Sequence, residues 1–341
     1  MHKFFFKISA IVVIVIGCWA GYEYFSNKTA AIEGVEKKFS EKKVVFGMTK
    51  WPGYMPLYIA KDQGYFDDAG LNLEIKTYDN LGDLSKDYRE GKIQGRANIT
   101  VDAIDESYQG LDHKIILVSD SSNGADAIVG RDSVKTFAAM KGKKVAFEHG
   151  TLEEFFLRYA LEQNDMSIED IKGVDLSPED SVTALLRGEV DVAVTHEPFL
   201  TVARKQENIH VLYTSKNAPG LITDILTFRS DFLDKNHEWV QAFVQAYFKG
   251  YDFYKTNPNE GIAILAKNLG VSREEVVGQL RGLSLKDLRD NRTAFTFAAG
   301  LQSLYGNLRQ TNEFVRVIRS SPTGLIDTDA IVEPKFIRGL K

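Results

Sequence analysis

The chain has 341 residues, of which 44% are hydrophobic and 26% charged, and its formal net charge is -5. This length is enough for two domains of ordinary size. Because both signs of charge are scattered along the chain, no basic face is available, which argues against a nucleic-acid-binding protein. Cys18 is the only cysteine, which excludes an intramolecular disulfide and a cysteine-rich zinc site.

The first 25 residues have the composition of a targeting or anchoring segment. A short cationic start precedes an uncharged apolar run over residues 8–17, as in a secretory signal peptide. The run ends in Val15-Ile16-Gly17-Cys18, which resembles the lipobox of bacterial lipoproteins and makes Cys18 the expected lipidation site. The alternative is an uncleaved membrane anchor, since residues 8–25 are long enough to span a bilayer as a helix.

Either reading places the body of the protein outside the cytoplasm, anchored to a membrane in the periplasm or at the cell exterior. Residues 26–43 are polar and charged, and we expect them to form a tether between the membrane and the folded body.

From Val44 onward, short strand-like runs alternate with helical patterns. We expect strands at residues 44–48, 71–77, 144–147, 174–176, 190–195 and 221–228. We expect helices at residues 57–63, 81–90, 152–163, 181–187, 238–256, from Pro258 onward, 272–282 and 298–320. The alternation predicts an α/β fold with largely parallel sheets. A helix-ending glycine followed by a strand occurs at both Gly91 and Gly188, which indicates two similar lobes.

Several short motifs follow one another in a characteristic order. The first is Trp51-Pro52-Gly53-Tyr54-Met55-Pro56-Leu57-Tyr58-Ile59-Ala60, followed by Gly64-Tyr65-Phe66 and Gly70-Leu71. Later motifs are Ser121-Ser122-x-Gly124-Ala125-Asp126, Gly142-Lys143-Lys144-Val145, Gly150-Thr151, Leu185-Leu186-Arg187-Gly188-Glu189-Val190-Asp191, Glu197-Pro198 and Asp224. Over nearly the whole body, the chain resembles the periplasmic binding proteins for taurine, nitrate, alkanesulfonates and thiamin-precursor pyrimidines. Two departures from the family pattern, Gln94-Gly95 and His196, bear on the ligand more than on the fold.

The resemblance implies a type II periplasmic binding protein, with two α/β lobes joined by two crossing strands and a ligand in the cleft. Lobe 1 would contain residues 44–120 and 227–341, lobe 2 residues 127–220, and the crossings residues 121–126 and 221–226. The implied function is that of the substrate-binding protein of an ABC importer. Such a protein is a monomer without a cofactor that captures a small polar ligand by hinge closure and delivers it to the permease.

Candidate ligand-binding residues lie in the motif segments and the expected crossings, and several of these segments follow the ends of predicted strands, where open α/β sheets bind their ligands. They are Trp51, Tyr54, Thr100, Ser122, Asp126, His149, Thr151, Glu197 and Asp224. Some have structural alternatives, because Trp51 could pack under its loop and Thr100 could cap a helix. Free N–H groups at His149-Gly150-Thr151 would favour an anion, but Glu153 and Glu154 already occupy that helical turn.

Acidic residues dominate these segments. Asp120, Asp126, Glu148, Glu197 and Asp224 lie at strand ends or in the crossings, and only His149 and His196 can supply a positive charge there. Because desolvated like charges are costly, a purely anionic ligand would meet net repulsion. We therefore expect a ligand with a cationic group, such as an amine or a zwitterion like taurine, with Asp224 and Glu197 as its partners. The alternative is that these acids make hinge or surface hydrogen bonds.

Other functions have weaker support in the sequence. Pyrimidine synthases for thiamin share the implied fold and carry a cysteine-rich motif, which this body lacks, and no Gly-x-Ser-x-Gly nucleophile elbow occurs. No His-x-x-x-His pair suggests a metal site. We therefore expect a protein that is not an enzyme and binds no metal. A membrane-tethered ligand sensor that docks on a signalling partner is the remaining alternative.

Overall fold

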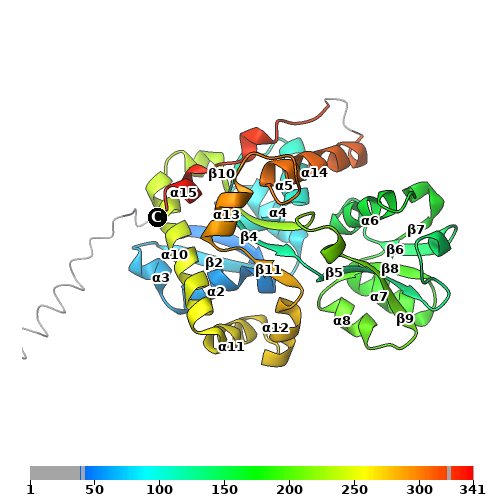
Figure 1. Cartoon of the computed structure of the whole chain (residues 1–341). Helices are drawn as coiled ribbons and strands as arrows, with labels where there is room; N and C mark the ends of the chain where they lie inside the picture. Colours follow the sequence, from blue (N-terminus) through cyan, green and yellow to red (C-terminus); the bar gives the residue numbers. More distant parts are fainter. Residues whose placement is uncertain (1–38, 40–42, 321–323, 341) are drawn as a thin grey trace, which may run out of the picture.

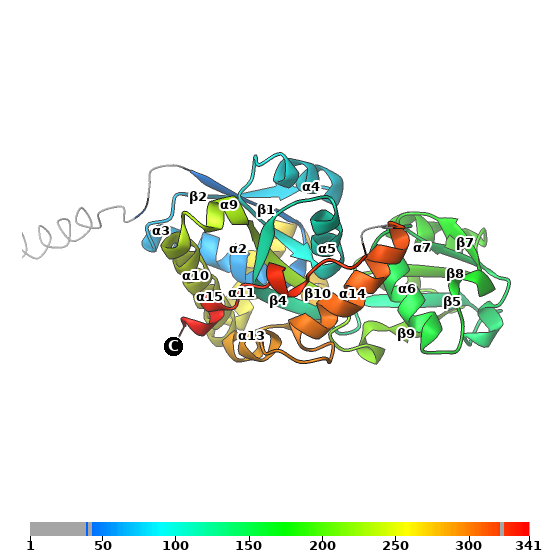
Figure 2. The ribbon, with the colours of Figure 1, turned by 90° about the horizontal axis from the view of Figure 1, so that it is seen from above.

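A computed structural model of the chain describes residues 39, 43–320 and 324–340. It has two lobes, each built on one β-sheet with helices packed around it (Figures 1 and 2). The predicted signal or anchor, the lipidation site Cys18 and most of the predicted tether lie outside the described residues. Within the described ranges, no helix has the length and apolar character needed to cross a membrane.

The larger lobe contains a six-stranded sheet with the strand order β11-β4-β10-β3-β1-β2. Its strands are β1 (Val44–Thr49), β2 (Leu73–Tyr78), β3 (Gly95–Ile99), β4 (His113–Ser122), β10 (Thr223–Arg229) and β11 (Leu283–Leu285). β1 pairs in parallel with β2 and β3, whereas β10 is antiparallel to β3 and β4. β10 lies between β3 and β4, which precede it in the sequence. The residues of the smaller lobe lie between β4 and β10 in the chain, so segments on both sides of that lobe build this sheet.

The smaller lobe contains a five-stranded sheet with the order β7-β6-β8-β5-β9. Its strands are β5 (Asp126–Arg131), β6 (Lys144–Phe147), β7 (Lys172–Asp175), β8 (Val192–His196) and β9 (Ile209–Thr214). β6 is parallel to β7 and β8, but β5 is antiparallel to β8 and β9. The α/β fold with two lobes is thus confirmed. Most strands of each sheet run in one direction, as predicted, but the strands that arrive from the other lobe run against them, β10 in the larger sheet and β5 in the smaller one.

Helices cover both sheets. In the larger lobe they are α2 (Met55–Asp62), α3 (Tyr65–Asp68), α4 (Leu81–Arg89), α5 (Thr100–Tyr108), α9 (Ser230–Leu233), α10 (His237–Thr256), α11 (Pro258–Leu269), α12 (Arg273–Leu280), α13 (Leu288–Ala294), α14 (Leu304–Ile318) and α15 (Lys335–Arg338). In the smaller lobe they are α6 (Leu152–Glu162), α7 (Pro178–Arg187) and α8 (Phe199–Arg204). Single turns of 3-10 helix are η1 (Pro52–Tyr54), η2 (Ala138–Met140), η3 (Ile168–Asp170), η4 (Ser215–Asn217) and η5 (Asp329–Ile331).

Most predicted helices are present, with one difference near the C-terminus. Ser272 forms the predicted capping box, since its side chain accepts from the backbone N–H of Glu275, whose carboxylate accepts from the backbone N–H of Ser272. The helix predicted for residues 298–320 begins only at Leu304, and α15 follows it.

Aromatic packing holds α10 against the sheet of the larger lobe. The ring of Phe243 on α10 lies 5.2 Å from that of Phe46 on β1 and 5.3 Å from that of Phe228 on β10, measured between centroids. A Cβ on Gly95 would lie 2.6 Å from the Phe228 ring, so β3 requires glycine here. Gln94, the residue that departs from the family pattern, holds the start of β3 against β1, since its Oε1 atom accepts a hydrogen bond from the Val45 backbone N–H at 2.9 Å.

Two short links join the lobes. Residues 123–125 connect β4 to β5, and residues 215–222 connect β9 to β10. The links are tied together, because the Ser122 and Ser215 hydroxyls are 2.7 Å apart and the backbone N–H of Gly124 donates to Ser215 Oγ at 2.6 Å. β10 already begins at Thr223, inside the range expected for the second crossing.

A second connection between the lobes lies beside the links. In both ribbon views α14 of the larger lobe runs next to α6 of the smaller one (Figures 1 and 2), and the rings of Phe314 and Phe155 are 4.9 Å apart. Both side chains are buried. This contact between α14 and α6 is apolar, whereas the contacts between the two links are hydrogen bonds between polar groups.

Candidate ligand-binding site

A cleft with a volume of about 480 Å³ lies between the two lobes. The last residues of β3 and β8 line it, as do the first residue of β5 and the start of β10. The strand directions explain this convergence, since the parallel strands end at the cleft and the antiparallel strands that come from the links begin there. The volume is typical of sites for small molecules.

Carboxylates dominate the walls of the cleft. Its acidic lining residues are Asp102, Asp105, Glu106, Asp126, Glu148, Glu153 and Asp224. The basic side chains of the lining are those of Arg89 and His196, and Arg96 lies buried directly behind the wall. The expectation that only His149 and His196 supply positive charge is therefore wrong.

The structure brings five of the nine predicted site residues together. Trp51, Tyr54 and Asp224 line the cleft from the larger lobe, and Asp126 and Thr151 line it from the smaller one. The rings of Trp51 and His196 meet edge-on across the cleft, with centroids 6.3 Å apart. The lining therefore combines the aromatic walls expected from the Trp51-Pro52-Gly53-Tyr54 motif with the acids at the starts of β5 and β10.

The other four predicted residues do not line this cleft, and local structure explains why. Thr100 is buried as the first residue of α5 and is not its N-cap, which is Ile99. The Ser122 hydroxyl is engaged with Ser215 in the links. The Nδ1 atom of His149 lies 3.1 Å from Glu154 Oε2 at the start of α6.

Glu197, expected as a partner of the ligand, instead caps α8. Its Oε2 atom accepts hydrogen bonds from the Thr201 backbone N–H at 3.0 Å and from the Thr201 hydroxyl at 2.7 Å. Its other oxygen lies 3.6 Å from Nη1 of Arg204. The carboxylate of Glu197 is thus satisfied inside the smaller lobe.

Asp224 occupies the start of β10 at the base of the cleft. Its Oδ1 atom accepts a hydrogen bond from the Tyr54 hydroxyl at 2.8 Å, and its partner across the sheet is Asp120 on β4. Burial raises the pKa of Asp224 well above its ordinary value, and the nearby charges of Asp120 and Asp126 raise it further. The carboxyl groups of Asp224 and Asp120 therefore lie on neighbouring strands, and both are buried.

Asp126 begins β5, opposite His196 on β8. The side chain is buried, and burial raises its pKa to about 6 against an opposing effect of His196. Among the described residues, its Oδ2 atom has no hydrogen-bond partner. Since buried polar atoms are nearly always paired, this free acceptor at the wall of the cleft is suited to a donor on a ligand.

Polar groups in the turn that precedes α6 form hydrogen bonds with acidic residues of this chain. The Gly150 backbone N–H donates to Glu154 Oε2 at 2.9 Å, and the Thr151 hydroxyl donates to the Glu148 carbonyl and to Glu153 Oε2, each at 2.7 Å. These contacts lie in the turn before α6, and Thr151, the N-cap residue, makes no side-chain capping hydrogen bond to the first turn of the helix.

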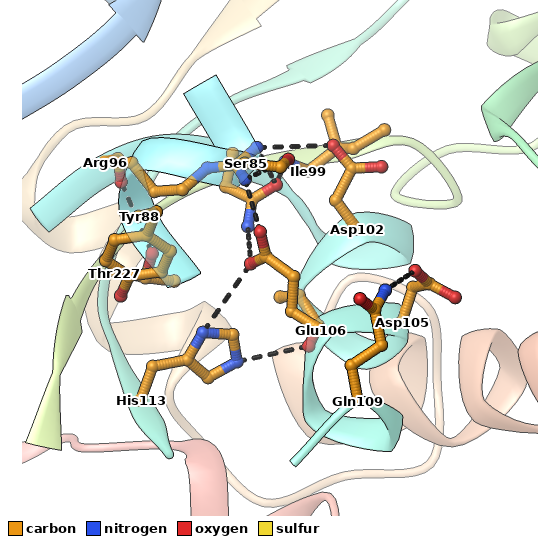
Figure 3. Close-up of polar contacts among 12 residues, drawn as sticks. Ser85, Tyr88, Arg96, Ile99, Asp102, Asp105, Glu106, Gln109, His113 and Thr227 are labelled. Carbon is orange, nitrogen blue, oxygen red and sulfur yellow. Dashed lines mark hydrogen bonds and ion pairs between the residues drawn. The ribbon is translucent and has the colours of Figure 1, made fainter. Parts of the chain in front are cut away.

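Behind the wall, Arg96 holds a buried polar network on β3 and α5 (Figure 3). Its Nη1 atom donates to Glu106 Oε1 at 2.5 Å and to Ser85 Oγ at 2.7 Å, and its Nη2 atom lies 3.4 Å from Asp102 Oδ2. Burial raises the pKa of Glu106 to about 7 and that of Asp102 to about 6, while Arg96 acts in the opposite direction.

His113 closes the back of this network. Burial lowers its pKa to about 4, so the imidazole is neutral, and its Nε2 atom lies 3.1 Å from the Ala103 carbonyl. Its Nδ1 atom faces Glu106 Oε2 at 3.8 Å (Figure 3). Sequence reasoning missed the network, although Asp102 and Glu106 share one face of the helix that follows β3, four residues apart.

Replacement of Arg96 tests the network. Arg96→Gln leaves the buried Glu106 and the partly exposed Asp102 without their cation, so we expect the free energy of unfolding to fall by about 3–5 kcal/mol at pH 8. The loss should be smaller near pH 5, where both carboxyls are protonated. Denaturant unfolding at the two pH values measures it, with the exposed Arg187→Gln on α7 of the smaller lobe as control. Equal effects of the two variants would contradict the assigned pairing.

The raised pKa of Asp126 predicts a pH dependence of stability. Because the folded pKa of about 6 exceeds the ordinary value of 3.8, the stability that this carboxyl contributes is present below about pH 4 and is lost as the pH rises through 6. Relative to Asp126→Asn, the wild type should lose roughly 2 kcal/mol between pH 4 and pH 7.5. Unfolding curves measure this difference, with Glu162→Gln at the exposed end of α6 as control. Parallel pH profiles for wild type and Asp126→Asn would show that the carboxyl is not perturbed.

Comparisons with known proteins agree with this architecture. The family model described as NMT1/THI5 like matches residues 51–261. The taurine-binding periplasmic protein of Escherichia coli is 24% identical over 233 residues, which cover 65% of this chain and 71% of that protein. The 4-amino-5-hydroxymethyl-2-methylpyrimidine phosphate synthase THI11 of Saccharomyces cerevisiae is 23% identical over 236 residues, which cover 64% of this chain and 69% of that enzyme.

The fold is also found among solved structures. The crystal structure of the periplasmic aliphatic sulphonate binding protein SsuA from Escherichia coli matches with a TM-score of 0.72 and 21% identity, and the match covers 86% of this chain and 93% of that one. The α/β periplasmic-binding-protein fold expected from the motifs is thereby confirmed. Together with the family match over residues 51–261, this shows that the chain belongs to the NMT1/THI5-like family.

Proposed function

We propose that this protein is the extracytoplasmic solute-binding receptor of an ABC importer. The observation that carries the proposal is a cleft of small-molecule size whose walls come from both lobes, which are joined by two short links. The names of the taurine-binding and sulphonate-binding relatives support the same role. Binding of a ligand to both walls would stabilise the closed arrangement, and the permease would recognise that closed form. The receptor acts as a monomer.

The proposed ligand is small and polar, and it carries a cationic group, as an amine or a zwitterion of the taurine type does. Asp224 and Asp126 are its proposed partners, because both are buried at the cleft and Asp126 retains a free acceptor atom. Trp51 and Tyr54 would wall off the ligand from water. Burial removes the interactions of these carboxylates with water, and a cationic group of the ligand would replace them.

The yeast relative raises an enzymatic alternative. The synthases of this fold were expected to carry a cysteine-rich motif, whereas the single cysteine of this chain is Cys18, outside the body. Without a nucleophile of that kind, the arrangement of acids and aromatic rings favours binding over catalysis.

For the N-terminus, we propose lipidation at Cys18 and attachment to the outer face of a membrane. Cys18→Ser would then remove the acyl chains, and the variant would be recovered in the soluble fraction. Mass spectrometry of the mature N-terminus and membrane fractionation measure the two effects. A Cys18→Ser variant that still partitions wholly into membranes would favour the uncleaved anchor.

A ligand panel tests the receptor and its ligand class together. The panel contains taurine, alkanesulfonates, nitrate, aminopyrimidines, choline, amines and amino acids, and thermal unfolding of the full chain is the readout. A ligand at 100 times its Kd adds about 2.7 kcal/mol of stability, which raises Tm by a few degrees. We expect amine-bearing compounds to do so, and Asp224→Asn to weaken their binding at least tenfold, because it removes a charge-assisted contact.

The control for this test is Glu162→Gln, which should bind like the wild type. Binding of nitrate and plain sulfonates alone would retain the receptor and contradict the cationic ligand. If no compound of the panel raises Tm, the result would contradict the proposed receptor function.

A further inference from the structure

Two residues behind the cleft wall, Gly53 and Asp120, are not among its lining residues. Asp120 lies on β4 and is buried, while Gly53 lies in η1, between the lining residues Trp51 and Tyr54. A Cβ added at Gly53 would overlap the Asp120 carboxyl and would lie 2.6 Å from Nε1 of Trp51. The carboxyl and the indole therefore border the same space, which is open because residue 53 has no side chain.

The carboxyl and the indole also have complementary atoms without hydrogen bonds. Within the residues that the structure describes, Nε1 of Trp51 is buried and has no acceptor, and Oδ1 of Asp120 is buried and has no donor. The other carboxyl oxygen of Asp120, Oδ2, accepts from the Ser119 hydroxyl at 3.1 Å. Burial raises the pKa of Asp120 to about 7, and the indole is already close enough to oppose this rise. Because buried polar atoms are nearly always paired, this donor and this acceptor indicate one interaction, which a small rotation of the indole completes.

The orientation of the Trp51 indole affects both walls of the cleft. Its ring meets the His196 ring of the smaller lobe edge-on, with centroids 6.3 Å apart. On the strand next to β4, Asp224 is the partner of Asp120 and accepts from the Tyr54 hydroxyl at 2.8 Å. Each of the two aromatic residues of the motif therefore has a buried carboxyl behind it, Asp120 for Trp51 and Asp224 for Tyr54.

We propose that Asp120 is a positioning residue of the cleft, whose carboxyl orients the Trp51 indole by accepting from Nε1 in the space that Gly53 leaves open. Neither Asp120 nor Gly53 contacts the ligand. Both act through Trp51, which forms the aromatic wall opposite His196. An effect on ligand affinity rests on the proposed receptor function, whereas the orientation of the indole does not.

The indole N–H signal of Trp51 tests the positioning without a ligand. Heteronuclear NMR of the full chain resolves the indole signals, and that of Trp51 is the one lost in Trp51→Phe. We expect Asp120→Leu to shift this signal, because it removes the acceptor. Asp120→Asn should leave the signal close to its wild-type position, because the amide oxygen can accept in the same place. A signal that Asp120→Leu leaves unchanged, or that both replacements shift equally, would overturn the proposal.

Gly53→Ala tests the shared space without a change of charge. Because the added Cβ must displace the carboxyl or the indole, we expect the Trp51 signal to shift. The affinities for 1-aminobutane and taurine, measured by isothermal titration, should fall several-fold. Gly278→Ala on α12 is the matched control, since its Cβ would meet no atom within 4 Å, and it should change neither quantity.

The outcomes separate this inference from the receptor function. An unchanged signal and unchanged affinities in Gly53→Ala would overturn the role of Gly53. If Gly53→Ala does not fold, the two Asp120 variants still decide whether the carboxyl orients the indole. If the wild type binds no compound while Asp120→Leu alone shifts the signal, the receptor function is contradicted and the positioning role of Asp120 is supported.

Discussion

Burial of carboxyl groups without accompanying cations is the constraint on which the site depends. Asp120, Asp126 and Asp224 lie where the two sheets meet, and burial raises the pKa of each. A protein gains no stability from such groups, since desolvation disfavours their charged form. At the cleft, Asp126 and Asp224 are therefore a cost to folding, which the proposed cationic ligand would offset.

The topology of the chain places these acids together. Each lobe receives one strand directly from a link, β5 in the smaller lobe and β10 in the larger one, and both strands begin at the cleft. Their first residues therefore lie at the hinge, where Ser122 and Ser215 tie the two links together. The proposed ligand contacts thus lie on strands next to the links, while α5 and α6 supply the walls on either side of the cleft.

The Arg96 network performs a different task. It neutralises Glu106 and Asp102 within the larger lobe, so that this wall stays folded while it presents acids to the cleft. The ion pair of Arg319 with Asp105 has a similar effect at the rim. The charge left for a ligand is consequently concentrated on the acids that lack such partners.

Most helices and strands and some of the cleft residues could be predicted from local sequence patterns. Strand direction and the contacts between elements could not, because they depend on the tertiary structure. Alternating periodicity indicated the strands and helices, and strand ends indicated Trp51, Asp126 and Asp224. Local patterns do not encode strand direction, which arises when the chain returns from the other lobe, so the reversed strands β5 and β10 were not foreseen. Glu197 was chosen for its motif, but its carboxylate caps a helix two residues on. Arg96 was missed because the sequence around a charged residue in a strand does not indicate which residues of another element it contacts.

The account depends most directly on whether cation binding forces the cleft carboxyls to ionise. Titration of the full chain with an amine of the ligand panel, such as 1-aminobutane, in buffers of different ionisation enthalpy counts the protons exchanged on binding. Because burial raises the pKa of Asp126 to about 6 and also raises the pKa of Asp224, the account predicts proton release on binding near pH 6.5. Binding without proton exchange near pH 6.5, or with proton uptake, would contradict it.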